Sequence, residues 1–421
     1  MRSLDRIGER LTAHLNPCDR APLAIGLSGG GDSLALLLVL HDWARAHGRR
    51  VLALTVDHGL QTAGAAWARW CAARCANLGV DHQVLEWSGM KPISGLSAKA
   101  RAARHALLAD AARSAGAKVL LLGHTADDIL EAEQMRAEGS TVGDPGEWVP
   151  SPAWPQGRDV FVFRPLLKTR RATLRDWLKA QGESWVEDPA NSDLASVRAR
   201  ARRQITEALP PPPELTSPCP QKVALQAFEP GPAQSLVSRR GDSIDTRQLA
   251  KAVTCAAGRQ MPVRGRQLTA LIQRLQPGAV FRTTLGGARI EATTDAIRLS
   301  REPGEFKRQA IEPQSLAQGQ LLVWDGRYEI LAQRAGLHVM PLQGLAARLP
   351  KDQRDGLGDL PAWARATLPV VVGEGLITCP ILAQDPDIRV RGLVFDRYLA
   401  AIGAICREPA SRRVEMTTKS P

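Results

Sequence analysis

The stretch PLAIGLSGGGDSLALLLVL, residues 22–40, decides the fold class of the N-terminal half of the chain. It joins a short apolar run to a glycine-rich turn and then to a longer apolar run with helical spacing. The same theme recurs as far as residue 123. The short apolar runs are residues 22–27, 51–56, 82–87 and 118–123. Near-continuous apolar strands of this kind are typical of a parallel sheet with helices on both faces.

Longer segments with helical spacing separate these runs, at residues 32–47, 62–78 and 96–115. The alternation predicts an α/β domain with a Rossmann-like, doubly wound parallel sheet. Ligands of such sheets bind beyond the carboxyl ends of the strands, where the strand order reverses. The turns that follow the strands are therefore the places to look for chemistry.

The chain has 421 residues, more than the ~250 to 300 at which a single core usually stops growing. Six prolines within residues 210–220 predict an extended, semi-rigid linker, since proline fixes φ and removes a donor. Helical spacing and then β-like segments follow it. The expected parts are a catalytic domain at 1–207, a linker at 208–220, a mainly helical region with strands at 221–319, and a β-rich region at 320–421.

Charge and cysteine content narrow the class of protein. The net charge of +12 favours a polyanionic partner such as nucleic acid, although a solubilising surface would give the same number. Seven scattered cysteines form neither a disulfide framework nor a zinc pattern, and Cys71 and Cys75 are expected to be small buried thiols. No signal peptide or long apolar run is present, so we expect a cytoplasmic protein without membrane contact.

The turn after the first strand, SGGGDS, has the composition of a phosphate cradle. Glycines allow backbone amides to approach an anion, and the following helix adds the positive end of its dipole. The turn matches neither the GxxxxGK[ST] loop nor the GxGxxG dinucleotide pattern. A tight strand-to-helix connection without a ligand is the alternative.

Polar residues follow the other strands as well. Asp57 and His58 end the second strand in VDHGL, and Arg101 and Arg104 share a helix face in ARAARH. A solvated helix face would also explain the arginine pair. The fourth strand leads into LGHTADDILEAEQMR, which contains His124, Asp127, Asp128 and Glu131. Helix capping would explain Asp127 but not the histidine and the third carboxylate.

In chain order, the motifs are SGGGDS, VDHGL, ARAARH and LGHTADDILEAEQMR. This series resembles the tRNA(Ile)-lysidine synthetase family of PP-loop ATP pyrophosphatases. The resemblance continues through RPLL at Arg164–Leu167 and WVEDPAN at Trp185–Asn191, and covers about residues 22–203. It implies that ATP adenylates the C2 oxygen of the wobble cytidine in the CAU anticodon of tRNA(Ile). Free L-lysine then displaces AMP to form lysidine. The expected cofactors are ATP and Mg²⁺.

The resemblance also implies roles for particular residues. Those expected to be catalytic are Asp32, which would also hold the metal, and His124, Asp127, Asp128, Glu131 and Arg164. Those expected to bind ATP are Ser28, Gly29, Gly30, Gly31, Asp32, Ser33, Asp57, His58, Arg101 and Arg104. Which carboxylate holds lysine and which holds metal stays open.

Two basic clusters are expected to bind tRNA phosphates, and a solvated surface is the alternative for each. Their members are Lys168, Arg170, Arg171, Arg198, Arg200, Arg202 and Arg203. A homodimer stays an alternative to a monomer.

The sequence departs from the family pattern at Thr125, Ile129, Ala132 and Ala199. Those departures spare the glycine-rich turn, His124 and the three carboxylates. The rival functions are another PP-loop enzyme that thiolates tRNA and a tRNA-binding module whose ATP site has decayed.

Overall fold

The computed structural model describes residues 2–92, 94–140, 142–143, 145–187, 200–202, 227–241, 244–275, 278–383 and 385–410. The chain divides into two compact units. The first unit combines residues 1–220 with 405–421, and the second unit takes residues 221–404. The proline-rich linker expected at 208–220 lies outside the described residues, and the four-part domain division stays a prediction.

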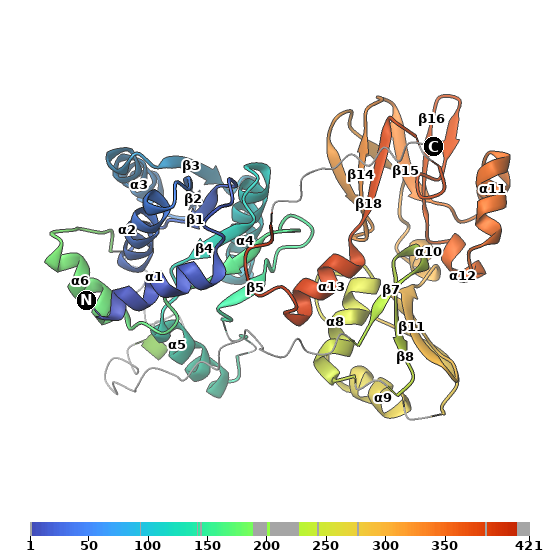
Figure 1. Ribbon diagram of the computed structural model, residues 1–421, viewed down its shortest axis with the longest axis horizontal. Helices are drawn as coiled ribbons and strands as arrows, with labels where there is room; N and C mark the ends of the chain where they lie inside the picture. The colour runs from blue at the N-terminus through green and yellow to red at the C-terminus, as the bar shows by residue number, and fades with distance from the viewer. Residues whose placement is uncertain are drawn as a thin grey trace. The chain divides into compact units, whose positions relative to one another are not determined.

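A six-stranded sheet forms the centre of the first unit (Figure 1). Five strands are parallel, and the edge strand β5 is antiparallel to its neighbour. The strand order reverses between β1 and β4, which confirms the predicted doubly wound sheet and places a switch point at the end of β1. In sheet order the strands are β3 (Asp81–Glu86), β2 (Val51–Asp57), β1 (Leu23–Gly26), β4 (Val119–Leu122), β6 (Phe161–Phe163) and β5 (Trp148–Pro150).

Helices cover both faces of this sheet (Figure 1). The helix α4 packs through Leu108 and Ala112 against strand residues such as Leu54 and Leu120. The crossovers through α2 and α3 run in the opposite direction along the sheet, so right-handed connections place them on the other face. The helices are α1 (Arg2–His14), α2 (Gly31–Ala46), α3 (Gly64–Leu78), α4 (Leu96–Ser114), α5 (Ala126–Ala137) and α6 (Arg171–Ala180). The predicted strands and helices before residue 123 are thus confirmed, while β5, β6 and α6 were not anticipated.

The C-terminal segment 405–410 packs in the first unit, although the sequence suggested a C-terminal region that runs unbroken to residue 421. Glu408 is the centre of its contacts. Its carboxylate accepts two hydrogen bonds from Arg49, at 2.9 and 3.1 Å, and a third from the backbone N–H of Asn16 at 2.8 Å. The indole of Trp148 donates to the carbonyl of Ile405 at 2.9 Å. Both side chains of the Arg49–Glu408 pair are at most 1% exposed.

The second unit begins with a five-stranded antiparallel sheet. The helices α8 (Thr246–Ala256), α9 (Arg266–Arg274) and α13 (Val394–Ile402) contribute side chains to one core with it, including Leu249, Leu271 and Tyr398. In sheet order the strands are β7 (Glu229–Gly231), β8 (Ser235–Arg239), β11 (Ala296–Arg301), β10 (Ala288–Ala292) and β9 (Phe281–Leu285). The helical spacing expected after the linker corresponds to α8 and α9, and the β-like segments expected next correspond to β9, β10 and β11.

Two smaller sheets complete the second unit. One has the order β12 (Gln314–Leu316), β15 (Leu337–Pro341), β16 (Pro369–Gly373) and β17 (Leu376–Thr378). The other has the order β13 (Leu321–Trp324), β14 (Tyr328–Ala332) and β18 (Ile388–Gly392). Short helices accompany them, namely α10 (Gly304–Arg308), α11 (Lys351–Gly358) and α12 (Ala362–Arg365). Among the described residues, no helix combines the length and the apolar character needed to cross a membrane.

The WDGR motif at residues 324–327 has a structural explanation. Asp325 accepts hydrogen bonds from Arg301 at 2.8 Å and from Arg327 at 2.6 Å, and all three side chains are buried. Gly326 lies against Gly258 so closely that a Cβ on it would come within 2.2 Å of the Gly258 carbonyl oxygen. The motif therefore fixes the turn between β13 and β14 against the end of α8.

Candidate active site

The glycine-rich turn connects β1 to α2 at the switch point of the sheet. Helix α2 begins at Gly31, and Gly30 precedes it as N-cap residue without a side-chain cap. The hydroxyl of Ser33 accepts from the backbone N–H of Ser28 at 3.2 Å and donates to the carbonyl of Gly30 at 2.9 Å. The first-turn amides of α2 need an acceptor, and the helix dipole favours an anion at this end. The geometry of the turn therefore suits an anion, and its role as a phosphate cradle stays a prediction.

The segment after α6 packs directly on this turn. The backbone N–H of Val186 donates to the carbonyl of Gly29 at 3.0 Å. Gly29 has φ +82°, and a Cβ on it would lie 3.2 Å from Val186. A Cβ on Gly31 would lie 3.4 Å from the ring of Trp185. Glycines in the turn thus leave room for Trp185 and Val186, a link that sequence spacing does not show. Asp188–Asn191 lie outside the described residues.

Arg171 lies at the centre of a carboxylate cluster. Its Nε donates to Asp32 Oδ2 at 2.9 Å, one terminal nitrogen donates to Glu131 Oε1 at 3.1 Å, and the other lies 3.5 Å from Asp128 Oδ2. Burial by itself disfavours the charged guanidinium, but the three carboxylates together raise the pKa of Arg171 above its ordinary value. The sequence placed Arg171 in a tRNA-binding surface cluster. Its side chain is instead 13% exposed and lines the cavity of the glycine-rich turn.

The neighbouring acidic residues have partners of their own. Asp128 accepts hydrogen bonds from the backbone N–H and the hydroxyl of Thr125, at 2.8 and 2.9 Å, which fixes the start of α5. Asp127 accepts the backbone N–H of Arg171 at 2.7 Å and pairs with Arg170 at 3.1 Å. It therefore accepts an N–H at the start of helix α6, whereas the capping considered from the sequence concerned its own helix α5, whose N-cap is Thr125.

Asp32 carries the group that fits a metal ion. Its Oδ1 atom is buried and has no hydrogen-bond partner among the residues that the structure describes. Burial raises the pKa of this carboxyl above its ordinary value, and Arg171 opposes part of the rise. No three His, Cys, Asp or Glu side chains in the described ranges are grouped to hold an ion by themselves. One carboxylate oxygen that needs a partner suits Mg²⁺, which is commonly bound by one or two carboxylates together with substrate phosphates.

His124 and Arg164 form a second group beside the turn. Arg164 donates from Nε to His124 Nδ1 at 3.3 Å and from a terminal nitrogen to the carbonyl of Gly146 at 2.7 Å. Burial, assisted by the charge of Arg101, lowers the pKa of Arg164 to about 10, so the guanidinium stays charged at neutral pH. Because Nδ1 accepts a hydrogen bond, the proton of a neutral His124 ring lies on Nε2. His124 can therefore donate to a bound oxygen.

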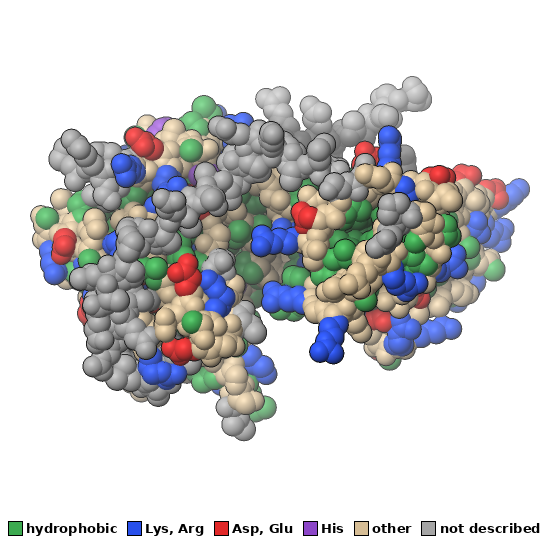
Figure 2. Space-filling model, turned by 90° about the horizontal axis from the view of Figure 1, so that it is seen from below, with side chains coloured by type: hydrophobic (Ala, Val, Ile, Leu, Met, Phe, Trp, Pro, Cys, Tyr) green, Lys and Arg blue, Asp and Glu red, His purple; other side chains and the backbone are tan. Residues whose placement is uncertain are grey.

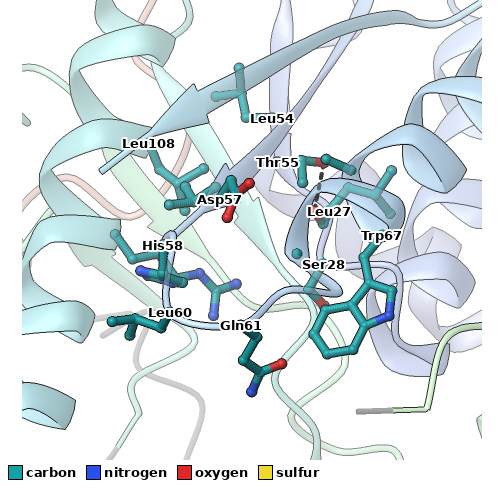
Figure 3. Close-up of a pocket in the computed structure, with 14 residues that line it drawn as sticks. Leu27, Ser28, Leu54, Thr55, Asp57, His58, Leu60, Gln61, Trp67 and Leu108 are labelled. Carbon is teal, nitrogen blue, oxygen red and sulfur yellow. Dashed lines mark hydrogen bonds between the residues drawn. The ribbon is translucent and has the colours of Figure 1, made fainter. Parts of the chain in front are cut away.

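A cavity of about 250 Å³ lies beside the turn and is largely apolar (Figure 3). Figure 3 shows Asp57 and His58 at the end of β2 and Trp67 on the opposite side. Burial, followed by the charge of Arg104, lowers the pKa of His58. Ser28 and Arg104 line both this cavity and the one that contains Asp32, so the two cavities adjoin. The lining also includes Leu27, Leu54, Thr55, Val56, Leu60, Gln61, Gly64, Ala68 and Leu108.

The remaining basic residues fall into different environments. Arg101 and Arg104 both line the cavity of the glycine-rich turn, as their shared helix face predicted. Arg202, expected on the tRNA surface, donates to Glu131 Oε1 at 2.9 Å inside the carboxylate cluster. Lys168 and Arg200 are exposed. Arg198 and Arg203 lie outside the described residues.

The surface itself does not single out a tRNA contact. Figure 2 shows Lys and Arg side chains at many places on one face, with Asp and Glu side chains between several of them. The tRNA-binding assignments made from the sequence therefore stay predictions.

The cysteines near the turn have the character of packing groups. Cys71 and Cys75 both lie on the buried face of α3, and neither is solvent-exposed. Burial raises the pKa of Cys71 and raises that of Cys75 to about 12. Protonated, buried thiols are poor nucleophiles and poor metal ligands. This argues against the thiolation alternative.

His105 on α4 gives a pH-dependent prediction. Burial, followed by the charges of Arg101 and Arg104, lowers its pKa to about 3. In the unfolded chain the imidazole binds a proton near pH 6.5. His105 therefore does not change the stability above pH 6.5, and it lowers the free energy of unfolding progressively as the pH falls toward 3. We expect the free energy of unfolding to fall by up to about 1.4 kcal/mol per pH unit from this group. Urea unfolding of His105→Asn at a series of pH values should show a shallower acid loss of stability than the wild type, and an unchanged slope would contradict the prediction.

The fold and the site define the class of the protein: a PP-loop nucleotide-binding domain with a carboxylate cluster beside the loop. The family model described as "PP-loop domain" matches residues 4–209. A relative from Caulobacter vibrioides named tRNA(Ile)-lysidine synthase is 45% identical over 96% of this chain and 99% of its own length. The chain belongs to the tRNA(Ile)-lysidine synthase family of ATP-using enzymes.

Further comparisons extend over different parts of the chain. A tRNA(Ile)-lysidine synthase from Brucella anthropi is 31% identical over 91% of this chain and 94% of its own length. The solved structure of the U34-tRNA thiolase NcsA from Methanococcus maripaludis is 19% identical, with a TM-score of 0.41, and covers 49% of this chain and 73% of that chain.

Proposed function

We propose that the protein ligates free L-lysine to carbon 2 of the wobble cytidine in the CAU anticodon of tRNA(Ile), converting ATP to AMP and pyrophosphate. The observation that carries the proposal is the 45% identity, along nearly the whole of both chains, to a tRNA(Ile)-lysidine synthase. The intact loop and the carboxylate cluster support it. Because tRNA and free lysine are cytoplasmic substrates, we propose the same location for the enzyme.

The two adjoining cavities suit the two ends of ATP. The nucleoside fits the apolar cavity between Trp67 and Leu108, with polar groups of Asp57 and His58 at its rim. The triphosphate then runs past Ser28, which lines both cavities, to the loop and the N-terminus of α2. In this arrangement the bond between the α and β phosphates would lie over the glycines.

A magnesium ion would be held by Asp32 together with the β and γ phosphates, and would neutralise charge on the leaving pyrophosphate. The loop amides and Arg101 and Arg104 would assist in that neutralisation, since both arginines line the cavity. His124, with its Nε2 proton directed by the bond from Arg164 to Nδ1, would donate to a phosphate oxygen. These residues therefore account for the first half of the reaction.

The chemistry has two balanced steps. In the first, the C2 oxygen of the cytidine attacks the α phosphate, an O–P bond forms, and pyrophosphate leaves. In the second, the ε-ammonium of lysine gives a proton to a carboxylate of the cavity, the resulting amine attacks C2, a C–N bond forms, the C2–O bond breaks, and AMP departs with the oxygen. Adenylation thus turns a poor leaving oxygen into a good one, and holding all partners in one site lowers the entropic cost.

The lysine side chain needs an anionic site for its ammonium group before it reacts. Asp128 and Glu131 are buried carboxylates on the same side of α5, and both face the cavity cation Arg171. We assign the ammonium to these two rather than to Asp127, whose oxygens are engaged at the start of α6. The family departures at Ile129 and Ala132 are buried apolar positions on the same helix.

The second unit is proposed to select the tRNA. A methionine tRNA carries the same CAU anticodon, so anticodon contacts alone cannot choose the substrate. Simple truncation after residue 220 would also remove Glu408 and its bonds to Arg49 from the first unit. A better variant joins residue 220 to residue 405 through a long flexible linker. It should keep ATP activation and lose most of the preference for tRNA(Ile) over the methionine tRNA, measured as the ratio of modification rates.

The function itself is tested by nucleoside mass analysis of CAU-anticodon tRNA(Ile) after incubation with the protein, ATP and lysine. We expect lysidine only when all three are present. A thiolated nucleoside would favour the thiolation alternative. Binding of the tRNA without any ATP-dependent change would favour a decayed site.

A further inference from the structure

The place of Arg171 is unusual for a helix-terminal arginine. It is the first residue of α6, yet its guanidinium reaches into the catalytic cavity and contacts carboxylates from both α2 and α5. The proposed function assigns this cavity to a metal ion and an ammonium group. In the described structure, the guanidinium of Arg171 is the cation that the three carboxylates contact. The positive charge of Arg171 therefore lies where the cationic ligands of the carboxylates would bind.

A purely structural role for Arg171 would be to tie α2, α5 and α6 together. Two observations go beyond that role. A guanidinium can bind both oxygens of a carboxylate side by side, but Arg171 takes only Oδ2 of Asp32 and leaves Oδ1 buried without a partner among the described residues. In addition, Asp32, Asp128 and Arg171 all line one cavity with the glycine-rich turn, so the contact faces the ligand space.

We propose that Arg171 is a positioning residue that occupies the place of the divalent cation while the site is free of nucleotide. When ATP arrives with its cation, the guanidinium passes from Asp32 to the phosphates and leaves Asp32 for the metal. The proposal rests on the proposed use of ATP at this loop. It explains why an acidic cluster of three carboxylates would not fill with free cations before the nucleotide binds.

The electrostatic argument is direct. A positive charge about 3 Å from Asp32 Oδ2 opposes a second cation at the same carboxylate. Phosphates bound at the loop reverse that balance, because they supply new acceptors for the guanidinium and further ligands for the metal. Metal and nucleotide should therefore bind together and only weakly one without the other.

The test uses Mn²⁺ as the probe, with the full-length chain and no tRNA or lysine. The free-ion signal of Mn²⁺ in electron paramagnetic resonance gives its affinity directly. We expect Arg171→Met to bind Mn²⁺ alone at least about tenfold more tightly than the wild type, because the competing charge is gone. The same variant should bind ATP in the presence of Mn²⁺ at least about tenfold more weakly, because the phosphates lose a guanidinium.

The opposite directions of these two changes distinguish the proposal from a structural role, which would weaken both affinities. Lys179→Met is the matched control: it removes the same charge from the same helix α6, but Lys179 is 68% exposed and is not one of the residues that line the cavity. We expect at most a twofold change there. Adding Asp32→Asn to Arg171→Met should abolish the gain in Mn²⁺ affinity.

If Arg171→Met does not fold, Arg171→Lys keeps the charge and should keep the low affinity for Mn²⁺ alone while still weakening ATP binding. Unchanged Mn²⁺ affinity in folded Arg171→Met, or an equal gain in Lys179→Met, would overturn the proposal. Neither result depends on lysidine formation. Failure of the proposed function would appear separately, as an absence of lysidine with normal metal and ATP binding.

Discussion

Asp32→Asn is expected to reduce the tRNA-dependent release of pyrophosphate on the order of a thousandfold, corresponding to about 4 kcal/mol. The substitution keeps the shape of the side chain and removes the charge that would hold magnesium. The tRNA affinity should change little, since Asp32 lies in the nucleotide cavity. Pyrophosphate release and tRNA filter binding measure the two effects independently.

The matched control is Asp42→Asn, an exposed position on the same helix α2. It should retain wild-type rates. If Asp32→Asn released pyrophosphate at a rate within tenfold of the wild type, the assignment of the metal to Asp32 would be wrong. An equal loss of tRNA affinity would show that the nucleotide cavity and the tRNA surface are not separate.

Glu408→Ala is expected to destabilise the first unit by about 3 to 5 kcal/mol. The substitution leaves Arg49 charged and buried, and breaking a buried ion pair from one side is more costly than its net contribution. The backbone N–H of Asn16 also loses its acceptor. Chemical denaturation of the full-length chain measures the change.

A double variant separates the pair from its surroundings. Arg49→Met combined with Glu408→Leu should lose less stability than the sum of the two single changes, because neither partner then remains as an unpaired charge. Additive losses would mean that the two side chains are not coupled. An unchanged stability in Glu408→Ala would mean that segment 405–410 does not stabilise the first unit.

The parallel sheet and the glycine-rich turn could be predicted because their signals are local. Each of the strands β1, β2, β3 and β4 is a single apolar run, and the helices between them have regular spacing. The turn at Ser28–Ser33 follows a strand and opens a helix, so both its structure and its ligand class follow from neighbouring residues. Asp57, His58, Arg101 and Arg104 line the two cavities beside the turn, as the rule for strand ends and helix faces suggests, and their binding of ATP stays a prediction.

Arg171 and Arg202 could not be placed in the same way. Both belong to basic runs, which usually lie in solvent. Their partner Glu131 is 40 residues from Arg171 and 71 residues from Arg202 in the sequence, and the residues next to either arginine do not indicate it. The packing of Trp185 and Val186 on the turn is another long-range contact of this kind. The resemblance pointed to WVEDPAN as a motif, but only the structure shows that it covers Gly29 and Gly31.

The return of residues 405–410 to the first unit was missed for a related reason. Glu408 is one acidic residue in an irregular segment, and its partner Arg49 is 359 residues away. Neither periodicity nor turn composition carries that information. Only the burial of both charges shows that the segment is part of the fold.

The most direct test of the account follows the oxygen of the wobble cytidine. CAU-anticodon tRNA(Ile) would carry a heavy-oxygen label at C2 of that cytidine and be incubated with the full-length protein, ATP and lysine. If the loop adenylates this oxygen before lysine attacks, the label must appear in the phosphate group of the released AMP, in an amount equal to the lysidine formed. Lysidine accompanied by unlabelled AMP would contradict the adenylated intermediate on which the account depends.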